Sequence, residues 1–124
     1  MGVLVGFECK DAESQISLRC YVTPWFMDQA IIAIARATKE TAAIGVDKNS
    51  LWDIAMPFES ESSLPKEGEK KSFTNADGYE FSVARQPGDS KKVRVTLVDM
   101  GRELDSILLE HEDCLAVHEM FATT

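Results

Sequence analysis

The chain has 124 residues, of which 44% are hydrophobic and 27% charged, which is enough apolar content for the core of one domain. Its net charge of −8 argues against nucleic acid as a partner, because phosphate binding requires clustered Lys and Arg. The three cysteines form no Cys-x-x-Cys motif, and the N-terminus lacks a signal-peptide pattern. No apolar run reaches the about 20 residues of a membrane helix. We therefore expect one cytoplasmic domain over residues 1–124.

The first predicted elements are two strands, residues 3–9 and 16–22, in which apolar and polar side chains alternate. The apolar residues are odd-numbered in the first strand and even-numbered in the second. Because opposed residues in an antiparallel pair share a face, the paired numbers must have an odd sum, as for Phe7 and Leu18. We therefore predict an antiparallel hairpin.

A long helix is predicted next. Pro24 suits the first helical position, and Gly45 suits a C-terminal stop. On a helical projection of residues 25–43, polar side chains form a narrow stripe and apolar side chains cover most of the remainder. Trp25 and Ile32 fall on or beside the polar stripe. They are either covered by a neighbouring loop or exposed as anchors for a partner or a second subunit.

A short helix and a connector are predicted for the middle of the chain. Ser50 and Asp53 match a capping box, which predicts one or two helical turns through Met56. Residues 59–71 contain one Leu, a Pro and a Gly among nearly balanced charges, which predicts a flexible connector on the surface. A lid over a site is the alternative interpretation of this connector.

The clearest strand pattern lies in residues 79–100, where two alternating segments flank a Pro-Gly turn. Both apolar sets are odd-numbered, so the pairing sum must be even, as for Val83 with Val93, and the loop must hold three or five residues. A short strand at residues 72–74 is predicted to precede this hairpin.

A final helix is predicted for residues 101–124, with an apolar arc from Leu104 to Phe121. The element order is then β-β-α, a short α, β-β-β, α. This order predicts an α+β fold, with one antiparallel sheet of about five strands and helices packed mainly on one face. No internal repeat is evident beyond the shared hairpin shape.

The sequence contains no nucleotide-binding or catalytic motif. His111, Cys114 and His118 share one face of the predicted final helix, and these residue types bind zinc. Structural zinc sites usually take four ligands from different elements, however, and only Cys9 and Cys20 could complete this set, both on strand faces predicted to lie in the core. Acidic neighbours also favour the thiol of Cys114 over the reactive thiolate. We therefore predict no catalytic residue, no metal and no cofactor.

Charge distribution carries the functional prediction. Residues 101–124 contain one basic and six acidic side chains, a net of −5 out of −8. Acidic groups interleaved with apolar ones can steer a basic partner and then hold it. The predicted partner-binding residues are Leu109, Glu110, Glu112, Asp113, Ala116, Glu119 and Met120, together with Trp25 and Ile32.

The sequence thus favours a non-catalytic acidic binding protein that inhibits or neutralises a basic protein partner, by analogy of size and charge with immunity proteins. One alternative is a small enzyme or ligand-binding α+β domain with a pocket between sheet and helices. Another alternative is a dimerising assembly or regulatory subunit, which would use the surface of Trp25 and Ile32 or an exposed sheet edge.

Overall fold

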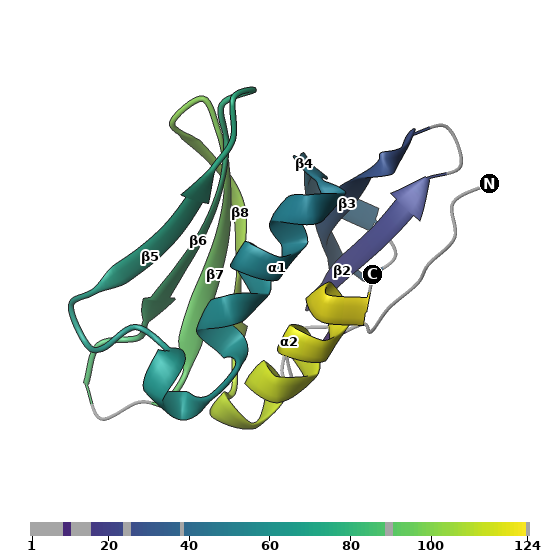
Figure 1. Ribbon diagram of the computed structural model, residues 1–124. Helices are drawn as coiled ribbons and strands as arrows, with labels where there is room; N and C mark the ends of the chain where they lie inside the picture. The colour runs from purple at the N-terminus through teal and green to yellow at the C-terminus, as the bar shows by residue number, and fades with distance from the viewer. Residues whose placement is uncertain (1–8, 11–15, 24–25, 38, 89–90, 124) are drawn as a thin grey trace.

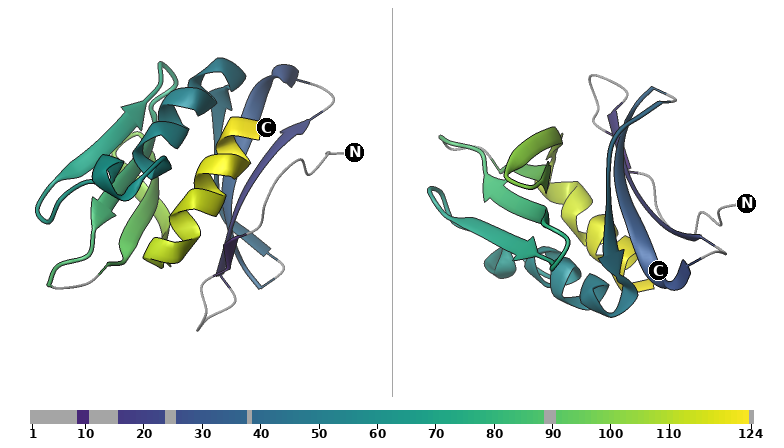
Figure 2. Two further views of the ribbon diagram at one scale, coloured as in Figure 1. Left: turned by 60° about the horizontal axis from the view of Figure 1, so that its bottom comes forward. Right: turned by 90° about the horizontal axis from the view of Figure 1, so that it is seen from above.

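A computed structural model describes residues 9–10, 16–23, 26–37, 39–88 and 91–123. These residues form two antiparallel sheets and two short helices. The α+β class predicted from the sequence is confirmed, whereas the single sheet of about five strands is wrong. Figures 1 and 2 show the two sheets splayed apart, with both helices packed between them on one side.

Sheet A follows chain order and comprises β1 (Cys9–Lys10), β2 (Ile16–Thr23), β3 (Phe26–Arg36) and β4 (Lys39–Asp47). Because β1 is only two residues long, three strands carry most of this sheet. Cys9 pairs with Leu18, so the odd pairing sum predicted for the first hairpin is confirmed. The predicted partner Phe7 lies outside the described residues.

Sheet B also follows chain order and comprises β5 (Lys70–Thr74), β6 (Tyr79–Arg85), β7 (Val93–Asp99) and β8 (Arg102–Leu109). The β6–β7 hairpin and its even pairing sum are confirmed, although Val83 pairs with Val95 rather than with Val93. The Gln86 amide donates a 3.0 Å hydrogen bond to the Lys92 carbonyl, which closes a five-residue loop of the predicted size.

The helix predicted for residues 25–43 is wrong, because this segment forms β3 and most of β4. β3 lies between two other strands of sheet A, and both Ala33 and Ile34 are fully buried although they point to opposite faces. A strand buried on both faces loses the polar alternation that distinguishes it from a buried helix. Ala37, at φ +57°, turns the chain from β3 into β4.

Each sheet is followed by a helical segment. The first contains the 3₁₀ turn η1 (Lys48–Ser50), α1 (Leu51–Ala55), η2 (Met56–Phe58) and η3 (Glu61–Ser63). The second contains η4 (His111–Asp113) and α2 (Cys114–Thr123). Among the residues described, no helix has the length and apolar character needed to cross a membrane.

These segments confirm the short central helix and half of the final one. The predicted capping box is wrong in detail, because Ser50 makes no side-chain capping bond, whereas the Asp47 carboxylate accepts from the Asn49 amide at 3.3 Å. The predicted helix over residues 101–124 is wrong for its first half, which is β8. Within the predicted connector, Leu64 is buried in the core, so this part does not lie on the surface.

One apolar core joins both sheets and both helices. At its centre, the ring of Phe121 from α2 lies 5.5 Å from that of Phe81 on β6 and 6.2 Å from that of Phe58 on η2. Phe58 and Phe81 are also 6.2 Å apart. The three aromatic rings therefore connect the first helical segment, sheet B and the final helix.

Polar contacts hold the two sheets together at the edge of this core. Arg36 at the end of β3 forms a two-pronged ion pair with Asp105 on β8, at 2.7 and 2.9 Å. The Thr41 hydroxyl donates to the same carboxylate. Elsewhere, the Asn75 side chain before β6 donates to the Gly45 carbonyl of β4 at 2.9 Å.

The structure also contains an internal repeat that the sequence does not reveal. Strands β2 to β4 recur as β6 to β8 at a constant offset of 63 residues, so the pair Leu18–Ile34 corresponds to the pair Phe81–Leu97. The register shift after Ile34 in β3 recurs after Leu97 in β7. The two sheets therefore share one pattern of strand pairing.

The helical segments continue the same repeat. Leu51 corresponds to Cys114 and Phe58 corresponds to Phe121, and all four side chains are buried. The two helices lie side by side (Figure 1). Trp52 corresponds to Leu115, and these two large apolar side chains are instead exposed, at 60% and 59%. Equivalent positions of the two repeats thus build both the core and one solvent-facing surface.

Candidate functional site

The acidic residues predicted to bind a partner lie on the outside of the protein. Glu110, Glu112 and Glu119 are exposed, and Asp113 and Ala116 are half-buried. Glu110 forms a 3.3 Å ion pair with a lysine on the loop before β7. The exposed carboxylates of η4 and α2 outside this ion pair are those of Glu112 and Glu119.

The apolar residues predicted for the same surface are placed differently. Ile32 on β3, Leu109 at the end of β8 and Met120 on α2 all point into the core and are at most 1% exposed. Their assignment as exposed anchors is therefore wrong. Trp25 lies outside the described residues. The predicted surface keeps its charge and loses the apolar side chains that were expected to hold a partner.

An exposed apolar surface of another composition lies across the two helical segments. We define this helical surface by Trp52, Met56, Leu115 and His118, of which Met56 is 43% exposed. The rings of Trp52 and His118 meet edge to face with centroids 6.5 Å apart. Met56 follows Trp52 by four residues and Leu115 precedes His118 by three, so each pair shares one helical face. Trp52 lies on α1, Met56 on η2, and Leu115 and His118 on α2, so the apolar strip spans both helical segments.

Exposed carboxylates accompany this helical surface, and we call them its acidic margin. Asp53, Glu59, Glu112 and Glu119 are all exposed and belong to the same two helical segments. Residues 49–65 and 103–124 contain no Lys or Arg at all. The elements that carry the four residues of the helical surface, α1, η2 and α2, therefore contain carboxylates and neither Lys nor Arg.

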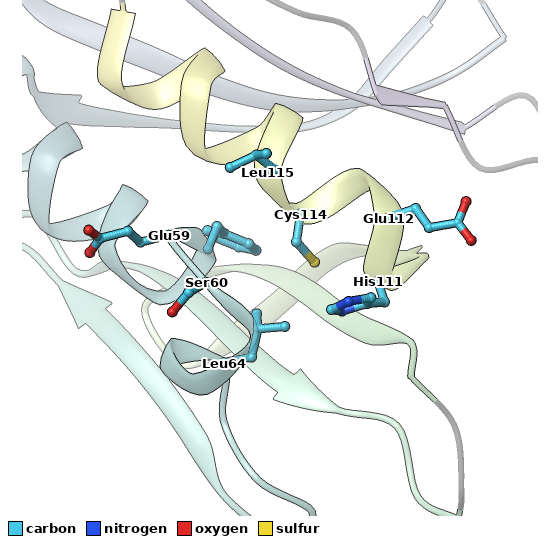
Figure 3. Close-up of a pocket in the computed structure, with 8 residues that line it drawn as sticks. Glu59, Ser60, Leu64, His111, Glu112, Cys114 and Leu115 are labelled. Atoms are coloured by element: carbon cyan, nitrogen blue, oxygen red, sulfur yellow. The ribbon is translucent and has the colours of Figure 1, made fainter.

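A pocket of about 320 Å³ opens at one end of the helical surface, between the η2–η3 and η4–α2 segments (Figure 3). The ring of His111 and the sulfur of Cys114 point toward the space in front of Leu64. The carboxylates of Glu59 and Glu112 extend on opposite sides of it. The residues that line the pocket are Phe58, Glu59, Ser60, Leu64, His111, Glu112, Cys114 and Leu115.

Cys114, which lines the pocket, is not an activated nucleophile. Burial, reinforced by the nearby charge of Asp113, raises the pKa of the Cys114 thiol to about 11. The thiol lies 3.7 Å from the Glu110 carbonyl, to which it donates. It is therefore protonated at neutral pH, whereas nucleophilic catalysis requires the thiolate.

The structure also separates the three residues that resemble zinc ligands in the sequence. His111 and Cys114 line the pocket, whereas His118 contacts Trp52 on the helical surface. Within the described part of the chain, no three His, Cys, Asp or Glu side chains gather in a group that could hold a metal ion.

Comparison with known proteins finds no family model that matches this sequence and no similar sequence among curated proteins. The fold and the site define an α+β protein with two repeated sheets, an exposed apolar helical surface and an acidic margin. A functional proposal for this chain therefore depends on its own geometry and charge.

Proposed function

We propose that the protein is a non-catalytic binding protein whose helical surface holds a basic protein partner. The observation that carries this proposal is the exposure of Trp52 and Leu115, at 60% and 59%, within a margin of carboxylates. Large apolar side chains that stay in solvent often mark an interaction site, and tryptophan is enriched among the residues that dominate binding energy.

The two kinds of side chain have separate roles in this proposal. The carboxylates attract a basic surface and increase the rate of encounter, while burial of the apolar strip slows dissociation. Covering a basic surface also blocks it from its own targets. The finer role that we propose is therefore inhibition of the partner, in the manner of an intracellular immunity-type neutraliser.

A designed peptide tests the chemistry of this surface without knowledge of the natural partner. The probe is a labelled amphipathic helix with one leucine face and one lysine face, and its control carries glutamate in place of lysine. Fluorescence anisotropy should give a Kd at least about tenfold lower for the lysine peptide. The affinity should fall as salt increases from low to moderate concentration, because salt screens exposed charges.

Variants then locate the binding site. Trp52→Ala and Leu115→Ala should each raise the Kd about tenfold or more, equivalent to about 1.4 kcal/mol. The matched control is Met100→Ala, because Met100 is 78% exposed but lies in the turn between β7 and β8. Equal effects of Trp52→Ala and Met100→Ala would show that the helical surface is not the binding site.

The contribution of the acidic margin to binding needs its own control. Charge reversal at Glu112 and Glu119 should weaken the lysine peptide, whereas reversal at Glu69 and Glu103 should not. Both control residues are exposed, and both lie outside α1, α2 and the pocket lining. If all four reversals act alike, net charge alone explains binding, and the proposed surface is wrong.

A second copy of the chain is the competing occupant of this surface. Light scattering over a range of concentrations distinguishes the two. A protein that stays monomeric supports a foreign partner. A dimer that Trp52→Lys converts to a monomer would overturn the proposal, because the apolar strip would then be a homodimer interface.

A further inference from the structure

We infer that the pocket beside the helical surface receives one basic side chain of the partner, an arginine or a lysine. This inference rests on the proposed function and adds to it the residue type that specifies the partner. Leu115 belongs both to the helical surface and to the pocket lining. A partner segment that covers Leu115 therefore also lies next to the pocket.

The inner part of the pocket suits the aliphatic stem of such a side chain. Phe58, Leu64 and Cys114 are each at most 4% exposed and present carbon and sulfur atoms to the cavity. The Cys114 thiol is uncharged at neutral pH and adds no electrostatic barrier to an apolar stem. Lysine and arginine bury their methylene groups along apolar surface while the charged end stays in a polar environment.

The outer part of the pocket suits a cation. In Figure 3 the carboxylates of Glu59 and Glu112 extend away from the pocket on opposite sides, and both residues are exposed, so binding of a cation at the opening requires one of these side chains to rotate toward it. Ser60 belongs to the same lining, and its hydroxyl lies 3.0 Å from the hydroxyls of Ser62 and Ser63. Carboxylates bind guanidinium and ammonium groups through charge-assisted hydrogen bonds. An anionic ligand would be repelled at the same opening.

One cation that influences the pocket is already bonded to the backbone. Arg85 on β6 donates to the Pro65 carbonyl at 2.9 Å, and its charge is the weakest of the three influences on the pKa of Cys114. None of the residues described as lining the pocket is Lys or Arg. The volume of about 320 Å³ also exceeds one side chain, which leaves room for waters that keep an ammonium or guanidinium group hydrated.

Four small probes that each contain a four-carbon chain test the inference: butylguanidinium, butylammonium, butanol and butyrate. In two-dimensional amide NMR spectra, the two cations should shift the resonances of Ser60, His111 and Leu115 in a saturable manner. Butanol should bind at least threefold more weakly than either cation, and butyrate should bind most weakly. Equal binding of butanol and the cations, or shifts confined to other residues, would overturn the assignment.

Carboxylate variants provide the matched control. Glu59→Gln combined with Glu112→Gln should remove the preference for butylammonium over butanol. Glu69→Gln combined with Glu103→Gln removes the same formal charge outside the pocket lining and should leave that preference unchanged. If both double variants reduce the preference equally, the overall charge of the protein and not the pocket selects the cation.

A further variant separates this inference from the proposed function. Ser60→Trp places a large ring at the opening and should abolish binding of the small cations and weaken the lysine peptide about tenfold. If the peptide is unaffected by Ser60→Trp and still depends on Trp52, the pocket inference fails while the helical surface stands. A submicromolar Kd for free butylammonium would instead identify a small-molecule site and overturn the side-chain assignment.

Discussion

Removal of the Phe121 side chain should destabilise the protein more than almost any other single truncation. Phe121 is 1% exposed, and its ring contacts Phe81 at right angles and Phe58 at 45°. Because Phe58 and Phe121 are equivalent positions of the two repeats, their contact is where the two helical segments meet the core. Phe121→Ala therefore removes a side chain that both repeats require.

The magnitude follows from burial and ring contacts. Burying a phenylalanine side chain contributes about 1.5–3 kcal/mol, and each well-oriented aromatic pair adds about 0.5–1.5 kcal/mol. Two ring contacts therefore place the cost of Phe121→Ala at about 2.5–6 kcal/mol, a range that contains the usual about 3–5 kcal/mol for buried phenylalanine. Phe58→Ala should cost a similar amount. The double variant should cost about 1 kcal/mol less than the sum, because the two rings share one contact.

Urea unfolding monitored by circular dichroism measures these free energies, with the m-value as a check on two-state behaviour. Phe121→Leu, with an expected cost of about 1 kcal/mol, keeps the test informative if Phe121→Ala does not fold. The control is Leu115→Ala, because this leucine is mostly exposed and should cost less than about 1 kcal/mol. A loss below about 1.5 kcal/mol for Phe121→Ala, or full additivity with Phe58→Ala, would refute the described core.

Three further predictions concern polar contacts and turns. A side-chain hydrogen bond from Arg36 on β3 lowers the pKa of Asp105 from its ordinary 3.8 to about 2. The stabilisation from this carboxyl group is therefore present above about pH 4 and is lost as pH falls through 2. Urea unfolding at several pH values should show that Asp105→Asn removes this part of the acid sensitivity. Asn75→Ala should cost about 1–3 kcal/mol, because the side-chain oxygen of Asn75 accepts from two backbone amides and its nitrogen donates to β4. In thermal unfolding, Asn75→Asp should recover part of this loss. Gly78→Ala should be at least about 1 kcal/mol more destabilising than Gly88→Ala, since both glycines have positive φ but only at Gly78 would a Cβ collide with the Met100 side chain.

A strand of this protein can be predicted from the sequence when only one of its two faces is apolar, because polar and apolar side chains then alternate. The β6–β7 hairpin is predictable because Arg94 and Thr96 alternate with buried valine and leucine residues. β3 carries Ala33 and Ala35 on the face where a polar residue would be expected, so its period is ambiguous between strand and helix. In β8, Leu108 falls between the buried Ile107 and Leu109, and this continuous apolar run extends the apparent helical arc toward the N-terminus.

The candidate site is less predictable because it depends on tertiary contacts. Trp52 could have been identified, since Leu51, Ile54 and Ala55 form the buried face of a short helix and leave Trp52 on the outer face. The pocket combines segments about fifty residues apart, which no local pattern brings together. The repeat is similarly hidden in the sequence, because strand register and burial are preserved while few equivalent residues are identical. Phe58 and Phe121 are one of the few identical pairs.

The repeat has a consequence for how a partner can dock. α1 and α2 run side by side in opposite directions, so a half-turn about the axis between them exchanges Trp52 with Leu115 (Figure 1). By shape alone, an elongated partner could lie on this strip in either of two directions. The difference in size between tryptophan and leucine, together with the pocket at the Leu115 end, makes the two directions unequal in energy. The chemical differences between the repeats therefore give the helical surface a polarity that its shared architecture lacks.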